Sequence, residues 1–331
     1  WKDTTSVYGG VHFLLYLLPS QIGQNDLITL VILYKLVPTL FAIGSFYVLY
    51  ILLKEQKKSS VIWGLIFVFW NPLFVLEIFG SGHNDSMMIF FTLLSYYFFR
   101  RKWWLISGLI LALAVQVKLI PVVLFFFCLV ALIRMKKYIA TVLFGVGFIS
   151  INIILFYYMQ VNILEFLQRV AYNGGVYWQS LPTLVMQFQP QLAQYIFIGF
   201  LLWVIYFVWY SWKQALDPLH SYAYVLLVYL LFVSAAYWNW YALWILPLIP
   251  LISDKKLSLT TLLLSFTSLF AYPLLWVIYR INTQSIIWPI LTYIFIFIPS
   301  IKLYLWYHFK EELMEKWLKK IKLNHLIAQK A

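Results

Sequence analysis

Long apolar segments, separated by short basic clusters, limit what this chain can fold into more than any other feature. Of its 331 residues, 64% are hydrophobic and only 11% are charged, whereas a soluble domain has about 45–50% apolar and about 25% charged residues. A segment of about 20 apolar residues spans a bilayer as an α-helix. The sequence therefore predicts an all-α polytopic membrane protein with the lipid bilayer as a partner.

Lysine and arginine residues gather between the apolar segments. Basic clusters stand at 54–58, 100–102, 134–137 and 255–256, and again from Lys302 onward. Such clusters mark cytoplasmic loops, so the net charge of +13 reflects membrane topology and no nucleic-acid partner is expected. We expect a multi-pass protein of the cell membrane.

The alternation of basic clusters predicts about eleven membrane-spanning helices within residues 1–306. They are expected at about 27–53, 61–79, 87–99, 103–133 (two short helices), 138–158, 191–212 and 219–236, followed by three that end near 254, 279 and 306. The two short helices turn at V-K-L-I-P (117–121), because Pro121 disfavours helix at the residue before it. The outer loops are short, except for a longer one at 159–190.

Both ends of the chain are expected to differ from this pattern. Residues 1–26 are expected to be the remnant of a first outer loop, with an interfacial helix at 11–18 that is far shorter than a span. Because this segment begins outside and the chain starts with Trp1 rather than Met, we expect an N-terminal truncation. Residues 307–331 are either a basic amphipathic helix on the cytoplasmic leaflet or a solvated end.

One polar stretch interrupts the apolar chain. Residues 70–87 read W-N-P-L-F-V-L-E-I-F-G-S-G-H-N-D-S-M and contain Glu77, His83, Asn84 and Asp85. Ionisable groups are costly near hydrocarbon, so their presence there is a sign of function. The loop pattern places this stretch outside, where it predicts the floor of an active site.

Other outer segments supply the groups that would complete such a site. They are Asp3, Tyr8, Lys118, Asn239, Trp240 and Tyr241, with Lys35 about eight residues inside a span. A carboxylate suits a general base that deprotonates a hydroxyl, a lysine suits a phosphate leaving group, and aromatic rings suit sugars. The set matches sugar transfer from a lipid phosphate to a hydroxyl.

Each of these residues also has a structural interpretation. Asp85 and His83 would cap the helix that enters at Ser86, and Glu77 or Lys118 would snorkel to the interface. The Trp and Tyr residues would be interfacial anchors.

Metal chemistry is not expected. The histidines and acids lack a ligand spacing such as H-x-x-x-H, and the single Cys128 offers neither a disulfide nor a cysteine metal site. No cofactor is predicted.

Four motifs resemble a known family. W-N-P-L-x-x-L-E followed by G-x-G-H-N-D-x-x-M (70–88) is similar to the signature of bacterial GT-C polyprenyl-phosphate-sugar-dependent glycosyltransferases, and is closest to the α-mannosyltransferases that use polyprenol-phosphate-mannose. W-K-D-T-T-S-V-Y-G-G (1–10), V-K-L-I-P (117–121) and N-W-Y-A-L-W-I-L-P-L (239–248) resemble further segments of that family. Gly10 replaces its usual Pro, and Trp238-Asn239 replaces its His-Pro.

The resemblance implies a GT-C-like bundle and an inverting transferase. It would move a hexose, mannose first of all, from a polyprenyl-phosphate donor to a glycan or glycolipid acceptor on the extracytoplasmic side. In that family an aspartate of the first outer loop is the general base. Asp3 lies in the surviving end of that loop, although the family's base generally falls further upstream.

The other candidates receive roles from the same resemblance. Asp85 and His83 would hold the acceptor or the sugar, or tune the base, and Lys118 would bind the phosphate. The remaining substrate-binding candidates are Tyr8, Lys35, Glu77, Asn84, Asn239, Trp240 and Tyr241.

Two other functions stay open on the sequence alone. A transporter or flippase of lipid-linked or polar substrates would also carry intramembrane charge, but would concentrate it at the midplane on broken helices. A non-catalytic subunit of a GT-C-type complex would need no base.

Overall fold

The computed structural model describes residues 8–57, 60–159, 180–189, 191–234, 237–274 and 287–310, and every regular element in these ranges is helical. Asp3, most of the 159–190 loop and the tail from 311 lie outside the described residues. The all-α class is confirmed for the part of the chain that is described.

The elements follow one another with short connections. In order they are α1 (Gly10–Gly23), α2 (Leu27–Glu55), α3 (Val61–Phe69), α4 (Pro72–Phe74), the π-helix η1 (Val75–Ser81), α5 (Asp85–Arg100), α6 (Trp104–Val117), α7 (Val122–Arg134), α8 (Tyr138–Tyr158), α10 (Leu181–Phe188), α11 (Leu192–Gln214), α12 (Pro218–Phe232), the 3₁₀ helices η2 (Asn239–Trp244) and η3 (Leu246–Leu251), α13 (Lys255–Ser268) and α15 (Ile287–Ile296). Residues 298–310 are also helical.

Several helices begin at a side chain that caps them. Asp26 accepts hydrogen bonds from Ile28 N and Thr29 N at the start of α2, and Asn71, Asp217 and Asp254 do the same for α4, α12 and α13. These caps satisfy backbone donors that have no partner inside the helix. The polar residues between apolar segments therefore fix where the helices start.

Four helices are long and apolar enough to cross a membrane: Leu27–Glu55, Tyr138–Tyr158, Tyr195–Gln214 and Lys255–Leu274. A bent pair, Val61–Phe69 and Pro72–Ser81, makes a fifth if it is one span, and four shorter apolar segments follow the same pattern. Within the described residues, length and composition thus support a membrane protein but do not confirm a count of about eleven spans.

Two expected spans have another form. The helix expected at 61–79 is broken and bends by 50°, because Asn71 caps a new helix with Pro72 in its first turn. The span expected to end near 254 is two 3₁₀ helices that contain Pro247 and Pro250. Proline removes a backbone donor and clashes with the preceding turn, so a regular α-helix does not form there.

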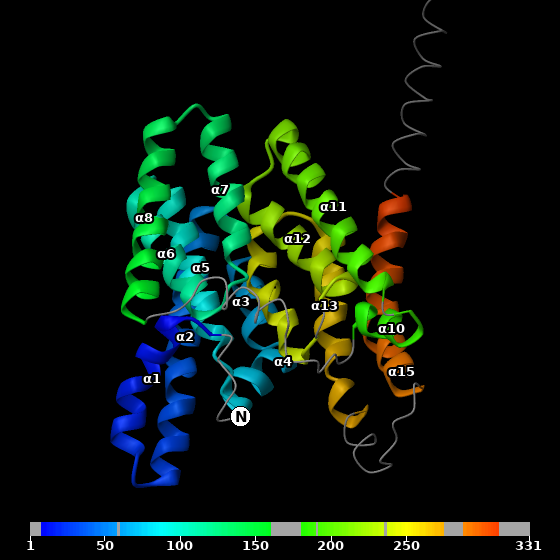
Figure 1. Ribbon diagram of the computed structural model, residues 1–331, viewed down its shortest axis with the longest axis horizontal. Coiled ribbons are helices and arrows are strands. Elements are labelled where there is room, and N and C mark those ends of the chain that lie inside the picture. Colours follow the sequence, from blue (N-terminus) through cyan, green and yellow to red (C-terminus); the bar gives the residue numbers. More distant parts are fainter. Residues whose placement is uncertain are drawn as a thin grey trace, which may run out of the picture.

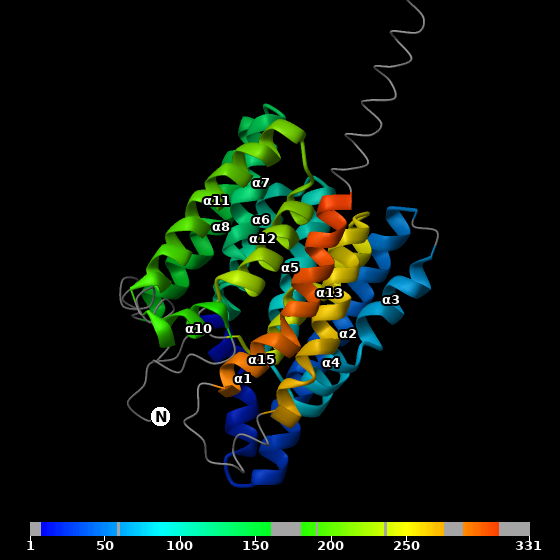
Figure 2. The same cartoon turned by 90° about the vertical axis from the view of Figure 1, so that its right-hand side faces the viewer.

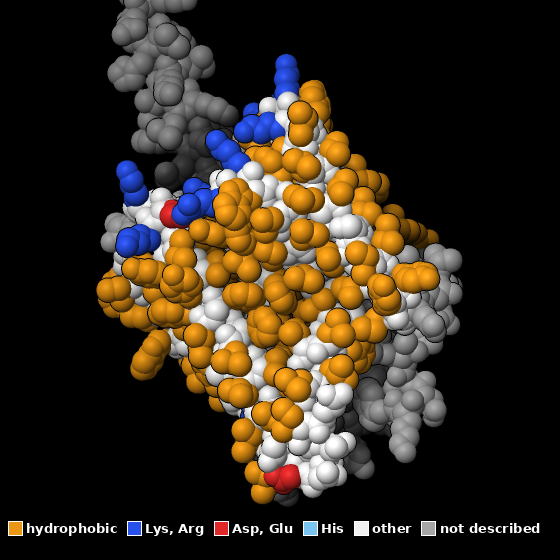
Figure 3. Space-filling model, turned by 90° about the vertical axis from the view of Figure 1, so that its left-hand side faces the viewer, with side chains coloured by type: hydrophobic (Ala, Val, Ile, Leu, Met, Phe, Trp, Pro, Cys, Tyr) orange, Lys and Arg blue, Asp and Glu red, His pale blue; other side chains and the backbone are white. Residues whose placement is uncertain are grey.

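Most of the described basic side chains lie at one end of the bundle, away from Lys35 and Lys118. Residues 54–57, 100–102, 134–137 and 213 mark what we call the basic end, and Figure 3 shows Lys and Arg side chains gathered there above a broad hydrophobic face. The turn between α1 and α2 lies at the opposite end in both ribbon views (Figures 1 and 2). The bundle therefore has a basic end and an opposite end, and the polar stretch at 77–85 lies toward the latter.

Candidate active site

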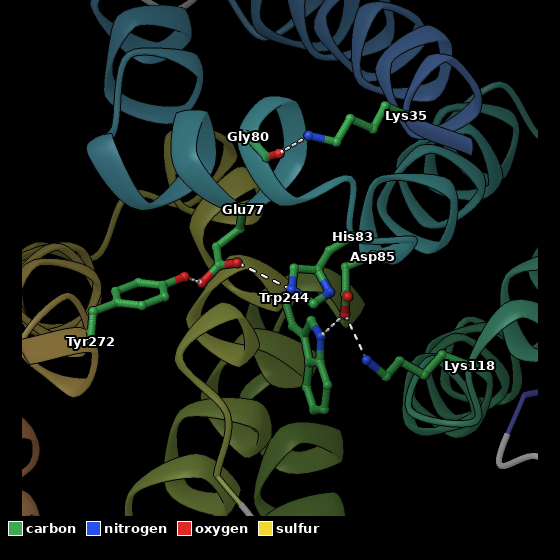
Figure 4. Close-up of polar contacts among 8 residues, drawn as sticks. All are labelled: Lys35, Glu77, Gly80, His83, Asp85, Lys118, Trp244 and Tyr272. Atoms are coloured by element: carbon green, nitrogen blue, oxygen red, sulfur yellow. Dashed lines mark hydrogen bonds and ion pairs between the residues drawn. The ribbon is translucent and has the colours of Figure 1, made fainter. Parts of the chain in front are cut away.

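Asp85, Lys118 and Trp244 form the centre of the candidate site (Figure 4). Asp85 Oδ1 accepts from Lys118 Nζ at 2.8 Å and from the indole Nε1 of Trp244 at 2.5 Å. The Asp85 side chain has no exposed surface, and that of Lys118 is 13% exposed. Asp85 Oδ2 is buried without a hydrogen-bond partner among the described residues. A buried carboxylate is thus held by two donors, with one oxygen left over.

Local backbone geometry brings Lys118 and Trp244 to this point. Lys118 ends α6 in an extended conformation, φ −155° and ψ 135°. In the 3₁₀ helix η2, residues three apart lie above one another, so Tyr241 and Trp244 stack with their centroids 4.0 Å apart. Lys118 Nζ lies 4.9 Å from each of these two rings. The lysine is therefore held by two aromatic faces as well as by Asp85.

Glu77 and His83 form a second pair beside the first. Glu77 is fully buried and accepts a hydrogen bond from Tyr272, while its Oε2 lies 3.2 Å from His83 Nε2. The His83 ring stacks on Trp240 at 3.8 Å and its side chain is 26% exposed. Of the two pairs, His83 is the group that a bound molecule reaches most directly.

The sharp turn after η1 explains how Glu77 and His83 meet. Gly82 has φ +79°, a left-handed conformation that glycine adopts without a steric penalty. The backbone N–H groups of both Gly82 and His83 donate to Glu77 O. The G-S-G-H segment thereby folds back over the π-helix and returns His83 to Glu77.

Lys35 fixes the end of the same π-helix. Its Nζ donates to Gly80 O at 2.6 Å, where unpaired carbonyls at a helix C-terminus favour a cation. This contact gives Lys35 a structural partner within the protein. Substrate binding by Lys35 stays a prediction.

The N-terminal segment closes the site from the side of α6. Gly10 N donates to Gln116 Oε1 at 3.0 Å, and a Cβ added to Gly9 would lie 2.6 Å from the backbone oxygen of Gln116. Gly9 therefore allows a close approach to Gln116, two residues before Lys118, where a side chain would not fit.

His12 joins this segment to the polar stretch. Its Nδ1 lies 3.0 Å from Asn84 Nδ2, and Tyr8 stacks on its ring at 4.4 Å. Burial and the neighbouring Lys118 lower the pKa of His12 to about 4, so its neutral ring accepts from the amide at pH 7. Burial and Asp85 raise the pKa of Tyr8, which keeps that hydroxyl protonated.

The structure places most of the expected residues together. Asp85, Lys118 and Tyr241 are in contact, as are Glu77, His83 and Trp240. Asn84 and Tyr8 both contact His12. Asn239 is buried and hydrogen bonds to Tyr272. Asp3 lies outside the described residues.

The structural interpretations of the same residues agree less well with the geometry. Asn84 is the N-cap residue of α5, but no side chain makes a capping hydrogen bond there, so capping does not account for Asn84 or Asp85. Glu77 is fully buried and Lys118 nearly so, hence neither snorkels to water. Asn71 of W-N-P, in contrast, caps α4 and donates to Ser265 Oγ, which is a structural role.

Three residues of the cluster were not predicted from the sequence: His12, Trp244 and Tyr272. Trp244 is part of the 239–248 motif, and its spacing of three from Tyr241 would have indicated stacking had a 3₁₀ helix been expected. Tyr272 lies in an apolar segment 195 residues from Glu77 and gives no such signal.

The arrangement is suited to binding and activating a polar molecule. Among the described residues, no group of three or more His, Cys, Asp or Glu side chains is placed to hold a metal ion. Lys118 offers a cation for an anionic group, His83 offers a ring nitrogen for proton exchange, and Trp240 offers an aromatic face.

One family model matches the N-terminal part of the chain. The model of the alpha-(1->6)-mannopyranosyltransferase N-terminal domain matches residues 1–134. These residues are therefore similar to a mannosyltransferase domain. The match contains 70–87 and 117–121, so it confirms the resemblance to a mannosyltransferase of the GT-C type. No curated protein and no solved structure matches the chain.

Proposed function

We propose that this protein is an integral-membrane glycosyltransferase that moves mannose from a polyprenyl-phosphate donor to a hydroxyl of a glycan or glycolipid on the extracytoplasmic face. The observation that carries the proposal is the buried Asp85–Lys118 ion pair, with the stacked rings of His83 and Trp240 beside it. Asp85, His83 and Lys118 lie within the segment that matches a mannosyltransferase domain. The side of the membrane follows from the positive-inside rule, since the basic loops lie at the opposite end.

Lys118 would bind the donor phosphate. Its ammonium has three donors, of which the described hydrogen bond to Asp85 uses one. As the C1–O bond of the donor breaks, negative charge grows on the departing lipid phosphate, and a fixed cation in a dry site stabilises it strongly. Asp85 and Trp244 are positioning residues, because they hold Lys118 and do not themselves reach solvent.

The acceptor side of the reaction would lie near His83. The acceptor oxygen forms a bond to C1, its proton passes to a base, and polyprenyl phosphate leaves. Asp3 is the proposed base within this sequence. Glu77 orients His83, which would hold the acceptor or the sugar on the Trp240 face together with Asn84, Tyr8 and Asn239.

A transporter is the second candidate, because one span is broken next to the polar stretch and broken helices are typical of transport sites. The depth of the site favours the transferase. The 16-residue helix α5 is about 24 Å long, so Asp85 lies near the far boundary of a hydrocarbon core about 30 Å thick. Transport sites lie near the midplane instead.

The test is transfer of radiolabelled mannose from polyprenyl-phosphate-mannose by the full-length protein reconstituted in vesicles. We expect lipid- or glycan-linked product from the wild type, and about a hundredfold slower transfer by Lys118→Ala. Asp85→Asn and His83→Ala should also slow transfer.

The same vesicles separate the alternatives. Comparable turnover by all three variants would refute the site assignment while leaving a transferase. Movement of the labelled donor between leaflets without a product would favour the flippase, and neither activity would favour a non-catalytic subunit.

A further inference from the structure

A cavity of about 500 Å³ lies at the basic end, far from the candidate active site. It lies between the ends of α2, α5 and η3 and the start of α12, and its polar lining includes Glu55, Lys57, Tyr96, Arg100, Asp217 and His220. Sites for small molecules have volumes of about 300–1,000 Å³. The cavity is therefore large enough for a charged group with a polar substituent.

The carboxylates in and beside this cavity already have partners. Glu55 pairs with Arg101. Asp217 accepts from Tyr96 Oη at 2.9 Å and from Leu219 N at 2.8 Å. Asp254, next to the lining, lies 3.2 Å from His220 Nε2 and caps α13. Because these carboxylates already have partners, the cavity is not expected to bind a cation.

The cations, in contrast, keep donors to which no described residue bonds. Arg100 contacts Tyr96. With the Gln56 amide turned so that its oxygen faces Arg100, Arg100 Nη1 donates to that oxygen at 2.9 Å. These contacts use two of the five N–H donors of a guanidinium. Lys57 stands in the adjoining turn with φ +52°. Arginine is the side chain that best matches the oxygens of a phosphate.

We propose that this cavity is a phosphate-binding site, with Arg100 as the main ligand and Lys57 as the second. This proposal does not depend on the proposed mannosyl transfer. The level of the basic loops is the level of the bilayer head groups, so the phosphate belongs either to the head group of an anionic lipid or to a free ion.

The experiment is a titration of the purified full-length protein in detergent, followed by the thermal shift of its tryptophan fluorescence. Three probes are compared: dihexanoyl phosphatidic acid, inorganic phosphate and dihexanoyl phosphatidylcholine. Arg100→Gln is the test variant and Lys213→Gln the matched control, since Lys213 lies at the basic end outside the cavity. Lys57→Gln serves as a second test if Arg100→Gln does not fold.

Phosphatidic acid should stabilise the wild type, and Arg100→Gln should weaken its binding by about tenfold or more, as loss of a charge-assisted hydrogen bond does. Lys213→Gln should bind like the wild type. Equal stabilisation by inorganic phosphate, with the same loss in Arg100→Gln, would assign the site to the free ion. Unchanged binding in Arg100→Gln and Lys57→Gln, or an equal loss in Lys213→Gln, would overturn the proposal.

Discussion

The two ends of the bundle use charge in opposite ways. At the site end, Asp85 and Glu77 have no exposed surface and each is held by aromatic residues as well as by a base. At the basic end, the Glu55–Arg101 pair is 27% and 52% exposed, and the aspartates cap helices. Both ends contain acids and bases, but among the described residues only the site end buries its carboxylates completely.

This difference has an energetic meaning. Exposed ion pairs contribute about 0–1 kcal/mol to stability, whereas burial of two charges costs several kcal/mol per ion before their attraction offsets it. A chain that buries such a pair near lipid gains nothing in stability over a hydrophobic pair. The site end is therefore better explained by function than by folding.

The largest expected effect comes from breaking one ion pair at each end. Lys118→Met leaves Asp85 buried and uncompensated, which should cost about 3–5 kcal/mol of unfolding free energy, whereas Arg101→Met should cost at most about 1 kcal/mol. Thermal unfolding of both variants in detergent measures the difference. The double variant Asp85→Asn/Lys118→Met should regain part of the stability, and equal losses in the two single variants would contradict the comparison.

A single donor can be removed at each end in the same manner. Trp244→Phe keeps the ring but removes a hydrogen bond to Asp85, at about 1.5–3 kcal/mol. Tyr96→Phe removes the corresponding bond to Asp217, which still accepts from Leu219 N and should lose less. The loss of unfolding free energy should therefore be larger in Trp244→Phe than in Tyr96→Phe. A larger loss in Tyr96→Phe would contradict the comparison.

Close packing next to Lys118 gives the next effect. Gly9→Ala places a methyl 2.6 Å from the Gln116 backbone oxygen and should cost about 1–3 kcal/mol, with slower transfer as the segment moves away from the site. Gly145→Ala is the control, because nothing lies within 4 Å of the added Cβ. A Gly9→Ala protein as stable as Gly145→Ala would show that the approach is not tight.

The last expected effect is a pH dependence at His12, which is absent at neutral pH. Its folded pKa of about 4 lies below the value of about 6.5 expected for an unfolded chain. The unfolded state therefore binds more protons between pH 6.5 and 4, and stability falls as the pH falls through this window. The loss in melting temperature should be smaller in His12→Gln, and parallel curves for the two proteins would contradict it.

The sequence predicted best what depends on neighbouring residues. The helix expected at 138–158 has those bounds, and the turn at 117–121 lies between α6 and α7, because hydropathy and proline act locally. The bend after Trp70 and the 3₁₀ form of 239–251 were missed, although Asn71-Pro72, Pro247 and Pro250 are their local causes.

The contents of the site were only partly predictable, for a different reason. Asp85 and Lys118 could be placed at one level because loop alternation fixes which ends of helices meet. Trp244 lies 159 residues from Asp85, and no periodicity relates the two positions. Such contacts depend on how the helices pack against one another. Local patterns in a single sequence do not predict that packing.

The decisive comparison is between the rates of mannose transfer from polyprenyl-phosphate-mannose by Lys118→Gln and by Lys213→Gln, measured in the same vesicles. Each variant loses one lysine, one from the buried site end and one from the exposed basic end. We expect the transfer rate to fall about a hundredfold in Lys118→Gln and to stay like that of the wild type in Lys213→Gln. Equal rates in the two variants would contradict this expectation.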